Sequence, residues 1–233
     1  YDYNGNFLRE KTSEAFYTEI TRTTDNILAI NSKILEPKHY LSLLNEEDHR
    51  ITVAKKIPLA FTYRGEFRCR GSYLLKSEHL YFTQNGDYTI YSWDNNRIKP
   101  VVTVDFGKYS YNPTQLNEEP HAPATRNKVL SIINVKEIRS NLFFNTNKIG
   151  LFVYNKTRHQ IVHAYGITNT NLGIVLHNSI ATEDTHNEIV AFSYDMPILQ
   201  RKLAGIASDN PVIKQIQNAK EDDNPLLFLY KSI

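Results

Sequence analysis

Residues 80–100 read LYFTQNGDYTIYSWDNNRIKP, and this stretch decides the fold class. Aromatic and β-branched residues, which strands favour, fill the runs predicted as strands at His79–Gln84, Tyr88–Trp93 and Ile98–Asp105. The interruptions between them, Asn85-Gly86-Asp87 and Asp94-Asn95-Asn96, carry residues that tolerate the backbone angles of tight turns. The stretch therefore predicts antiparallel strands joined by short turns.

The same pattern continues outward in both directions, in groups of about four strands every 40 to 50 residues, which is the repeat length of a β-propeller blade. Only Pro211–Lys220 looks helical, with proline in its first turn. The sequence therefore predicts an all-β domain over residues 1–233 with one short helix near the C-terminus. The remaining predicted strands are Ala15–Thr23, Ile27–Asn31, His39–Asn45, Ile51–Ile57, Phe67–Leu75, Val129–Arg139, Leu142–Asn145, Gly150–Tyr154, Gln160–Tyr165, Gly173–His177, Glu188–Tyr194 and Leu226–Tyr230.

Composition narrows the classes of function. Lys plus Arg number 27 and Asp plus Glu number 25, giving a net charge of +2 without a basic block, so no nucleic-acid partner is expected. Cys69 is the only cysteine, which excludes an intrachain disulfide and a cysteine-based zinc site. No apolar run reaches the ~18 residues of a membrane span. Because Tyr1 is not a natural start, the chain is expected to be truncated at its N-terminus, with any targeting segment upstream.

Two runs of sequence resemble a family of six-bladed β-propellers of the NHL or TolB type, exported by gut-dwelling Gram-negative bacteria and mostly without an assigned function. One run extends from Leu80 to Lys108, and the other is the ending Glu221–Lys231. The resemblance covers roughly residues 36–233 and implies the C-terminal part of a propeller, about four blades and a fraction. It also implies a periplasmic or cell-surface protein, with a lipid anchor possible upstream of this chain. It supplies no catalytic residues.

A cation or proton-transfer site is one hypothesis that the residues raise. The predicted loop 178–187 and its flank carry the weak candidates His177, Glu183, Asp184 and His186, and calcium is the cofactor that they could hold. The alternative is a solvated loop without a ligand and no cofactor at all. In the strand around 160–165, period two places His159 and His163 on one face, too far apart to share a metal easily.

Exposed aromatic residues next to polar ones are the other candidate site. The ligand-binding candidates are Tyr63, Arg64, Tyr91, Trp93 and Asn95, because such neighbours suit a sugar or peptide surface. Trp93, beside a polar turn, is the foremost of them, and its alternative role is packing at the end of a hairpin.

The leading hypothesis for function is a non-catalytic binding scaffold of the bacterial cell envelope, with a glycan, peptide or protein as ligand. It predicts exposed Tyr or Trp side chains beside satisfied polar groups on one face. A metal-dependent hydrolase or lyase at the mouth of the propeller channel is the first alternative, and it predicts converging His, Asp, Glu or Asn side chains. A purely structural domain of a larger assembly is the second.

Overall fold

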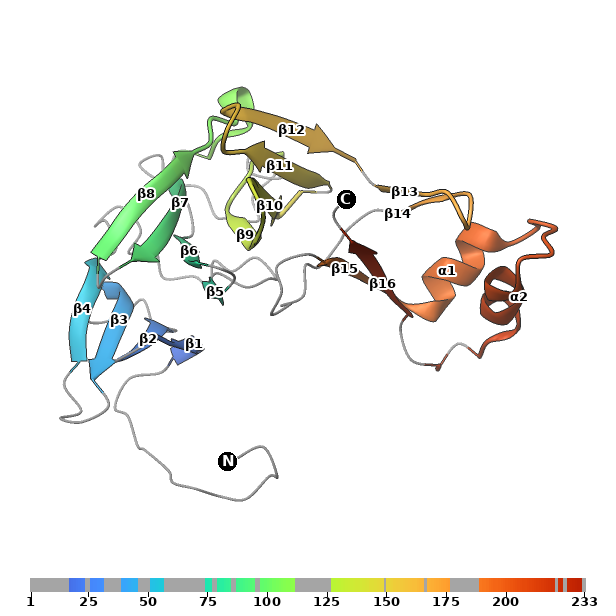
Figure 1. Cartoon of the computed structure of the whole chain (residues 1–233), viewed down its shortest axis with the longest axis horizontal. Coiled ribbons are helices and arrows are strands. Elements are labelled where there is room, and N and C mark those ends of the chain that lie inside the picture. The colour runs from blue at the N-terminus through green and yellow to red at the C-terminus, as the bar shows by residue number, and fades with distance from the viewer. Residues whose placement is uncertain are drawn as a thin grey trace, which may run out of the picture. The chain divides into compact units, whose positions relative to one another are not determined.

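The computed structural model describes residues 17–23, 26–31, 39–45, 51–56, 74–76, 79–84, 87–94, 97–111, 127–148, 150–165, 167–176, 189–220, 222–223 and 226–231. The chain divides into two compact units, residues 1–64 and residues 65–233. Both are built from antiparallel strands that follow one another in the sheet in the order of the sequence (Figure 1).

The first unit holds one four-stranded sheet in the order β1-β2-β3-β4. Its strands are β1 (Tyr17–Arg22), β2 (Asn26–Asn31), β3 (His39–Asn45) and β4 (Ile51–Lys56). Ala29 on β2 and Leu41 on β3 are fully buried. Burial of their apolar side chains stabilises the two central strands of this sheet.

Two four-stranded sheets form the centre of the second unit, and each is an antiparallel meander. They meet through the fully buried strand β9, which contacts β5, β6 and β7. Between them lies an apolar cluster that includes Ile90, Ile132, Leu142 and Phe144. The strands of the first sheet are β5 (Leu74–Lys76), β6 (Leu80–Gln84), β7 (Asp87–Asp94) and β8 (Arg97–Thr103); those of the second are β9 (Ile132–Ile138), β10 (Asn141–Thr146), β11 (Leu151–Asn155) and β12 (Gln160–Ala164).

The rest of the second unit departs from this repeat. The pairs β13 (Ile167–Asn169) with β14 (Ile174–Leu176) and β15 (Ile189–Tyr194) with β16 (Leu226–Lys231) form two-stranded sheets. Helices α1 (Met196–Leu203) and α2 (Pro211–Asn218) lie between β15 and β16 in the sequence. Their buried faces, with Leu199, Leu203, Ile213 and Ile216, form a second apolar cluster that also takes in Ile138 of β9.

The prediction of a six-bladed propeller is wrong. The four-stranded repeat on which it depended ends after β12, and the described residues beyond it form two hairpins and two helices. The described part of the chain holds three four-stranded sheets rather than six. The β-rich class and most strand positions are confirmed: β3 matches its predicted bounds, and most other strands differ by a few residues. Strand β13 was not predicted, and residues 67–73 of the predicted strand Phe67–Leu75 lie outside the described residues.

The prediction of a single helix is also wrong, because α1 precedes the predicted α2. The C-terminal end of each helix accepts hydrogen bonds from a glutamine side chain of the other helix. Gln200 of α1 donates from Nε2 to the carbonyl oxygens of Ile216 (3.2 Å) and Ala219 (2.6 Å) at the end of α2. Gln217 of α2 donates to the carbonyl oxygens of Leu203 (2.9 Å) and Ile206 (3.0 Å) at the end of α1. The two side chains thus satisfy carbonyl groups that a helix end leaves without a partner.

Replacing Gln217 by alanine is expected to lower the free energy of unfolding by about 1 kcal/mol, because the carbonyl groups at the end of α1 lose their donor. Gln215→Ala, on the exposed surface of the same helix, is the matched control and should stay within about 0.5 kcal/mol of the parent. Urea denaturation measures both. Equal losses for the two variants would show that helix propensity, rather than the reciprocal caps, determines the effect.

Candidate functional site

Turns from both central sheets of the second unit come together at one end. In the first sheet, the pairs Leu80–Trp93 and Asp94–Arg97 place His79 beside the turn between β7 and β8. In the second sheet, the backbone N–H of Lys156 donates to the carbonyl oxygen of Ser140 at 2.7 Å, so the β11–β12 turn lies beside the β9–β10 turn. A carboxylate of β9 connects these two groups of turns.

That carboxylate belongs to Glu137, whose side chain is only 1% exposed. Its Oε2 lies 2.9 Å from Nδ1 of His79, at the start of β6, and its Oε1 pairs with Nζ of Lys156. Burial alone would raise the pKa of Glu137, but hydrogen bonds from Lys156, His79 and Tyr81 outweigh it and hold the pKa below the ordinary 4.5. The carboxylate is therefore charged at neutral pH and ties both sheets together at this end.

The second carboxylate of this end is engaged as well. Asp94 Oδ2 lies 2.5 Å from Nζ of Lys99, across the β7–β8 turn. The hydrogen bond from Lys99 lowers the pKa of Asp94, and His79 adds to the effect. Both groups are exposed, so this pair contributes little to stability. The effect of the pair is electrostatic, because Lys99 neutralises the negative charge that Asp94 brings to the β7–β8 turn.

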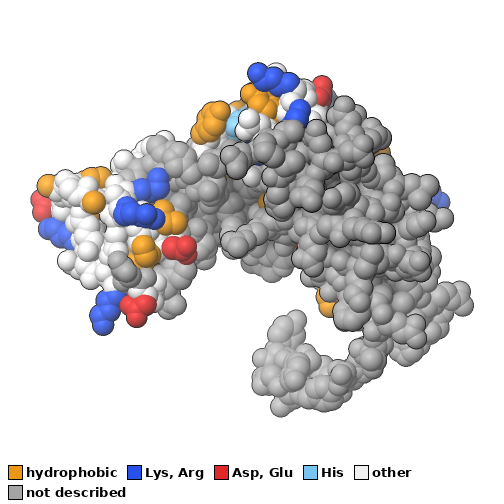
Figure 2. All heavy atoms as spheres, turned by 180° about the vertical axis from the view of Figure 1, so that it is seen from behind, with side chains coloured by type: hydrophobic (Ala, Val, Ile, Leu, Met, Phe, Trp, Pro, Cys, Tyr) orange, Lys and Arg blue, Asp and Glu red, His pale blue; other side chains and the backbone are white. Residues whose placement is uncertain are grey.

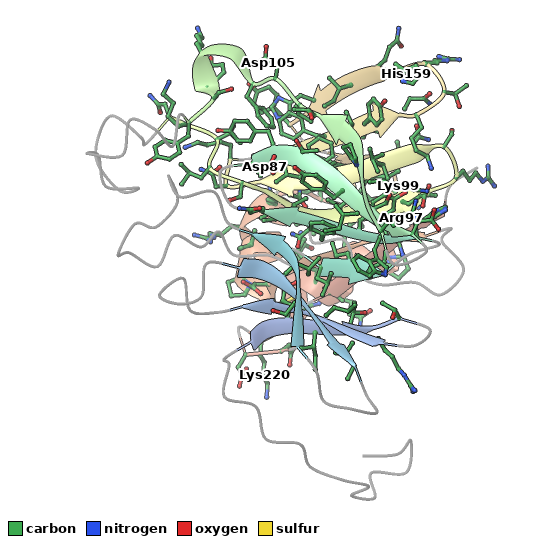
Figure 3. All side chains as sticks on the ribbon, turned by 90° about the vertical axis from the view of Figure 1, so that its left-hand side faces the viewer. Asp87, Arg97, Lys99, Asp105, His159 and Lys220 are labelled. Atoms are coloured by element: carbon green, nitrogen blue, oxygen red, sulfur yellow. The ribbon has the colours of Figure 1, made fainter. Side chains whose placement is uncertain are left out.

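The remaining charged side chains of these turns are arginines. Arg97, Arg139 and Arg158 are exposed, and within the described part of the chain none of their guanidinium groups is paired with a carboxylate. Figure 3 shows Arg97, Lys99 and His159 toward one end of the sheets, and Asp87 and Asp105 toward the other. We call the following set the basic end: His79, Arg97, Lys99, Arg139, Lys156, Arg158 and His159.

Backbone geometry sets two members of the basic end apart. Arg139 (φ 54°) and His159 (φ 52°) adopt left-handed backbone conformations, which residues other than glycine rarely take. Such a conformation costs of order 1 kcal/mol, least for Asn, Asp and His and more for a side chain such as arginine. Two turns thus carry large basic side chains at positions where the backbone would favour glycine.

A row of side chains continues from the basic end along one face of β12. His159 Nδ1 lies 3.0 Å from the hydroxyl of Tyr154, and the ring of His163 stacks on Phe152 at 4.3 Å. Since Tyr154 and Phe152 are two positions apart on β11, both histidines lie on the same face, as period two predicts. Tyr165 follows, with its ring 4.8 Å from that of His163. We call His159, Ile161, His163 and Tyr165 the β12 row.

The candidates proposed from sequence lie partly beside this site. Trp93 is half-buried at the end of β7, next to the Asp94–Lys99 pair. Tyr91 is half-buried too: its ring stacks on Phe82 at 5.1 Å, and its hydroxyl donates to Asp87 at 2.7 Å. Burial, followed by the interaction with Asp87, raises the pKa of Tyr91 to about 12. Tyr91 is therefore held in place by the fold, and its role in ligand binding stays a prediction.

Other predicted candidates lie outside the described residues. These are Tyr63, Arg64 and Asn95 for ligand binding, and His177, Glu183, Asp184 and His186 for a metal. Among the residues that are described, no group of three or more His, Cys, Asp or Glu side chains has the geometry to hold a metal ion. A helix long and apolar enough to cross a membrane is likewise absent from that part of the chain.

The sequence did not single out the basic end as a site. Its residues range from position 79 to position 159 and form no block, so only the pairing of strands brings them together. One signal was visible: a large basic residue in each of the two-residue and four-residue turns at Arg139-Ser140 and Lys156–His159. Turn positions are where a side chain is presented to solvent.

Fold and site together define a β-rich protein of antiparallel meander sheets with an exposed basic surface. The chain belongs to the family described as domain of unknown function DUF4934, whose model matches residues 1–231. No protein with a curated description matches the chain. Among solved structures, a protein of Bacteroides fragilis that is named as an exported protein is similar in fold, with a TM-score of 0.67 and 16% identity. The match covers 99% of this chain and 70% of that one.

Proposed function

We propose that the chain is a non-catalytic binding module of an exported protein, acting in the periplasm or at the cell surface, and that it holds an anionic ligand at the basic end. The observation that carries the proposal is the group of three exposed guanidinium groups, those of Arg97, Arg139 and Arg158, which have no carboxylate partner among the described residues. Arginine forms bidentate, charge-assisted hydrogen bonds with carboxylate and sulfate groups, so this arrangement suits an acidic ligand.

The state of the two carboxylates favours binding over catalysis. Glu137 is buried and bound by Lys156 and His79, and Asp94 is bound by Lys99. Neither is placed as a free general base or nucleophile, since each is occupied by a cation. What the basic end offers to a ligand is therefore positive charge and hydrogen-bond donors held on rigid turns.

Export of the protein also favours an acidic ligand. The fold neighbour is named as an exported protein, and an exported module meets extracellular polymers such as acidic glycans. The net charge of the whole chain is only +2, which is low for a protein that binds the nucleic-acid backbone. An acidic glycan or an acidic peptide is thus favoured as the ligand over a nucleic acid.

Charge substitution tests this proposal directly. The double variant Arg139→Gln, Arg158→Gln should bind dextran sulfate about tenfold or more weakly than the parent, because each lost charge-assisted hydrogen bond contributes about 1.5 kcal/mol. Parent affinity should also fall steeply as salt rises, while unmodified dextran should not bind. Isothermal titration calorimetry measures these affinities.

Arg201→Gln is the matched control, since Arg201 is an exposed arginine of α1 outside the basic end, and it should bind like the parent. Equal weakening by Arg201→Gln and by the double variant would mean that net charge alone attracts the polymer. Tighter binding of duplex DNA than of dextran sulfate would contradict the choice of ligand.

A further inference from the structure

We infer that the β12 row is a stacking surface for sugar rings, and that the ligand of the basic end is an acidic saccharide chain lying along β12. This inference rests on the proposed function and names its ligand class. Ile161 and His163 lie at alternate positions of β12, an edge strand of the β9–β12 sheet, with His159 just before the strand and Tyr165 just after it.

Exposure of the row is the first reason. Tyr165 is 72% exposed and Ile161 is 44% exposed, and both histidines are exposed as well. Figure 2 shows exposed hydrophobic side chains next to a histidine over β12, with Lys or Arg side chains close by. An apolar and aromatic strip of this kind, bordered by polar groups, is typical of a surface that binds a ligand.

The rings of the row are held in place from below. His163 stacks on Phe152, and Phe152 stacks in turn on the fully buried Phe144, at 5.3 Å between ring centres. On the other side, Phe106 meets the edge of Phe152 at 5.6 Å. The His163 ring therefore loses little conformational entropy when a ligand binds, since its position is already fixed.

Gly150 makes this stacking possible. A Cβ atom at this position would come within 2.2 Å of Nε2 of His163 and 3.0 Å of the carbonyl oxygen of Ala164. Its φ of 125° is also one that other residues avoid. The His163 ring thus lies directly over the backbone of Gly150, where a residue with a side chain would displace it.

The row is continuous with the basic end. His159 belongs to both, and Arg158 precedes it in the same turn. Ile161 and His163, about 6.6 Å apart on one face of β12, separate His159 from Tyr165 along the row. A ligand anchored by its charge at Arg158 would reach the exposed ring of Tyr165 only if it were an extended chain.

An acidic saccharide fits this combination better than an acidic peptide. Each sugar unit carries an apolar C–H face, which packs against an aromatic ring, and an acidic sugar carries a carboxylate or sulfate on the same unit. Asp and Glu side chains offer the charge but no comparable apolar face. The described surface has charge and rings side by side, which is what an acidic sugar chain requires.

Two ligands and three variants test the inference. The probes are an oligogalacturonate of defined length and a poly-glutamate peptide of similar charge. Tyr165→Ala should weaken binding of the oligogalacturonate about tenfold, as expected for the loss of a stacking aromatic side chain worth about 1.4 kcal/mol. It should leave the affinity for poly-glutamate unchanged. Tyr165→Phe retains the ring and should restore the affinity for the oligogalacturonate.

Val162→Ala is the matched control. Val162 is 60% exposed on the same strand, and alternation places it on the opposite face. This variant should bind both probes as the parent does, and thermal melting of each variant confirms that it is folded.

The inference is overturned if Tyr165→Ala binds the oligogalacturonate like the parent, or if it weakens both probes equally, in which case the row does not distinguish a sugar chain from a peptide. Failure of the proposed function gives a different result: the double variant Arg139→Gln, Arg158→Gln would then bind the oligogalacturonate as tightly as the parent, whatever Tyr165→Ala does. The two failures are therefore distinguishable.

Discussion

Replacing Lys156 by methionine is expected to lower the free energy of unfolding by about 3 kcal/mol at pH 7, because the buried carboxylate of Glu137 loses its cation. Methionine keeps most of the apolar stem of the lysine side chain, so the loss reports the charge rather than the packing. His79 remains as a hydrogen-bond partner of Glu137, but its side chain is 49% exposed and cannot replace the ammonium group in full. Urea denaturation measures the effect.

A second substitution isolates the ion pair. In a Glu137→Gln background, Lys156→Met should cost less than about 1 kcal/mol, since a neutral side chain no longer needs a cation. Asp94→Asn, which breaks the exposed pair with Lys99, is the comparison and should leave the free energy of unfolding nearly unchanged. A Lys156→Met variant as stable as the parent would show that the buried carboxylate is satisfied without Lys156.

Acidification should affect the parent and the Lys156→Met variant with opposite sign. In the parent, the pKa of Glu137 is lowered below 4.5, so its contribution to stability is present above about pH 4.5 and is lost as the pH falls through the lowered value. In Lys156→Met, burial no longer meets an opposing cation and raises the pKa of Glu137. Protonation then removes a buried charge, and the difference from the parent should shrink as the pH falls from 7 to 5.

Phe144→Ala is the second substitution with a large expected effect, about 3–5 kcal/mol of unfolding free energy. Phe144 is fully buried in the cluster between the two central sheets and stacks on Phe152. Truncation leaves a cavity and removes the support of the ring that carries His163. Phe144→Leu fills much of that volume and should lose only about 1–1.5 kcal/mol.

Binding distinguishes the role of Phe144 from general stability. At a temperature where both variants are folded, Phe144→Ala should weaken binding of oligogalacturonate, because the Phe152 and His163 rings lose a fixed position, while binding of the poly-glutamate peptide at the basic end should change little. Denaturation and calorimetry on the same samples measure this. Equal affinities of Phe144→Ala and the parent for oligogalacturonate would show that the β12 row binds the sugar chain without the support of the Phe144 ring.

The strands were predictable because their signal is local. Alternation of apolar and polar residues, with Asn, Asp and Gly in the turns, is present in the letters of residues 80–100, and β6, β7 and β8 lie there. The short strand β13 has only three residues, too few for a pattern. Helix α1 was missed although Asp195, Pro197 and the spacing of Met196, Leu199 and Leu203 form the start and buried face of a helix.

The propeller prediction failed for a related reason. A repeat of four strands describes hairpin connectivity, which is local, but closure of a ring depends on how successive sheets pack. Residues 167–223 include two helices whose apolar faces pack on Ile138 and Leu151 of the β9–β12 sheet. That packing uses side chains from segments far apart in the chain, and no repeat in the sequence predicts it.

What the sequence determined by itself is the antiparallel, mostly-β character of the chain and the places of most strands and turns, since these follow from preferences of neighbouring residues. What only the tertiary structure decided is the site. Glu137 is 58 positions from His79 and 19 from Lys156, and its burial, its charge and its two partners arise together when β6, β9 and the β11–β12 turn meet. The burial of this charge, and the nearby arginines that have no carboxylate partner among the described residues, depend on contacts between distant segments, which periodicity does not encode.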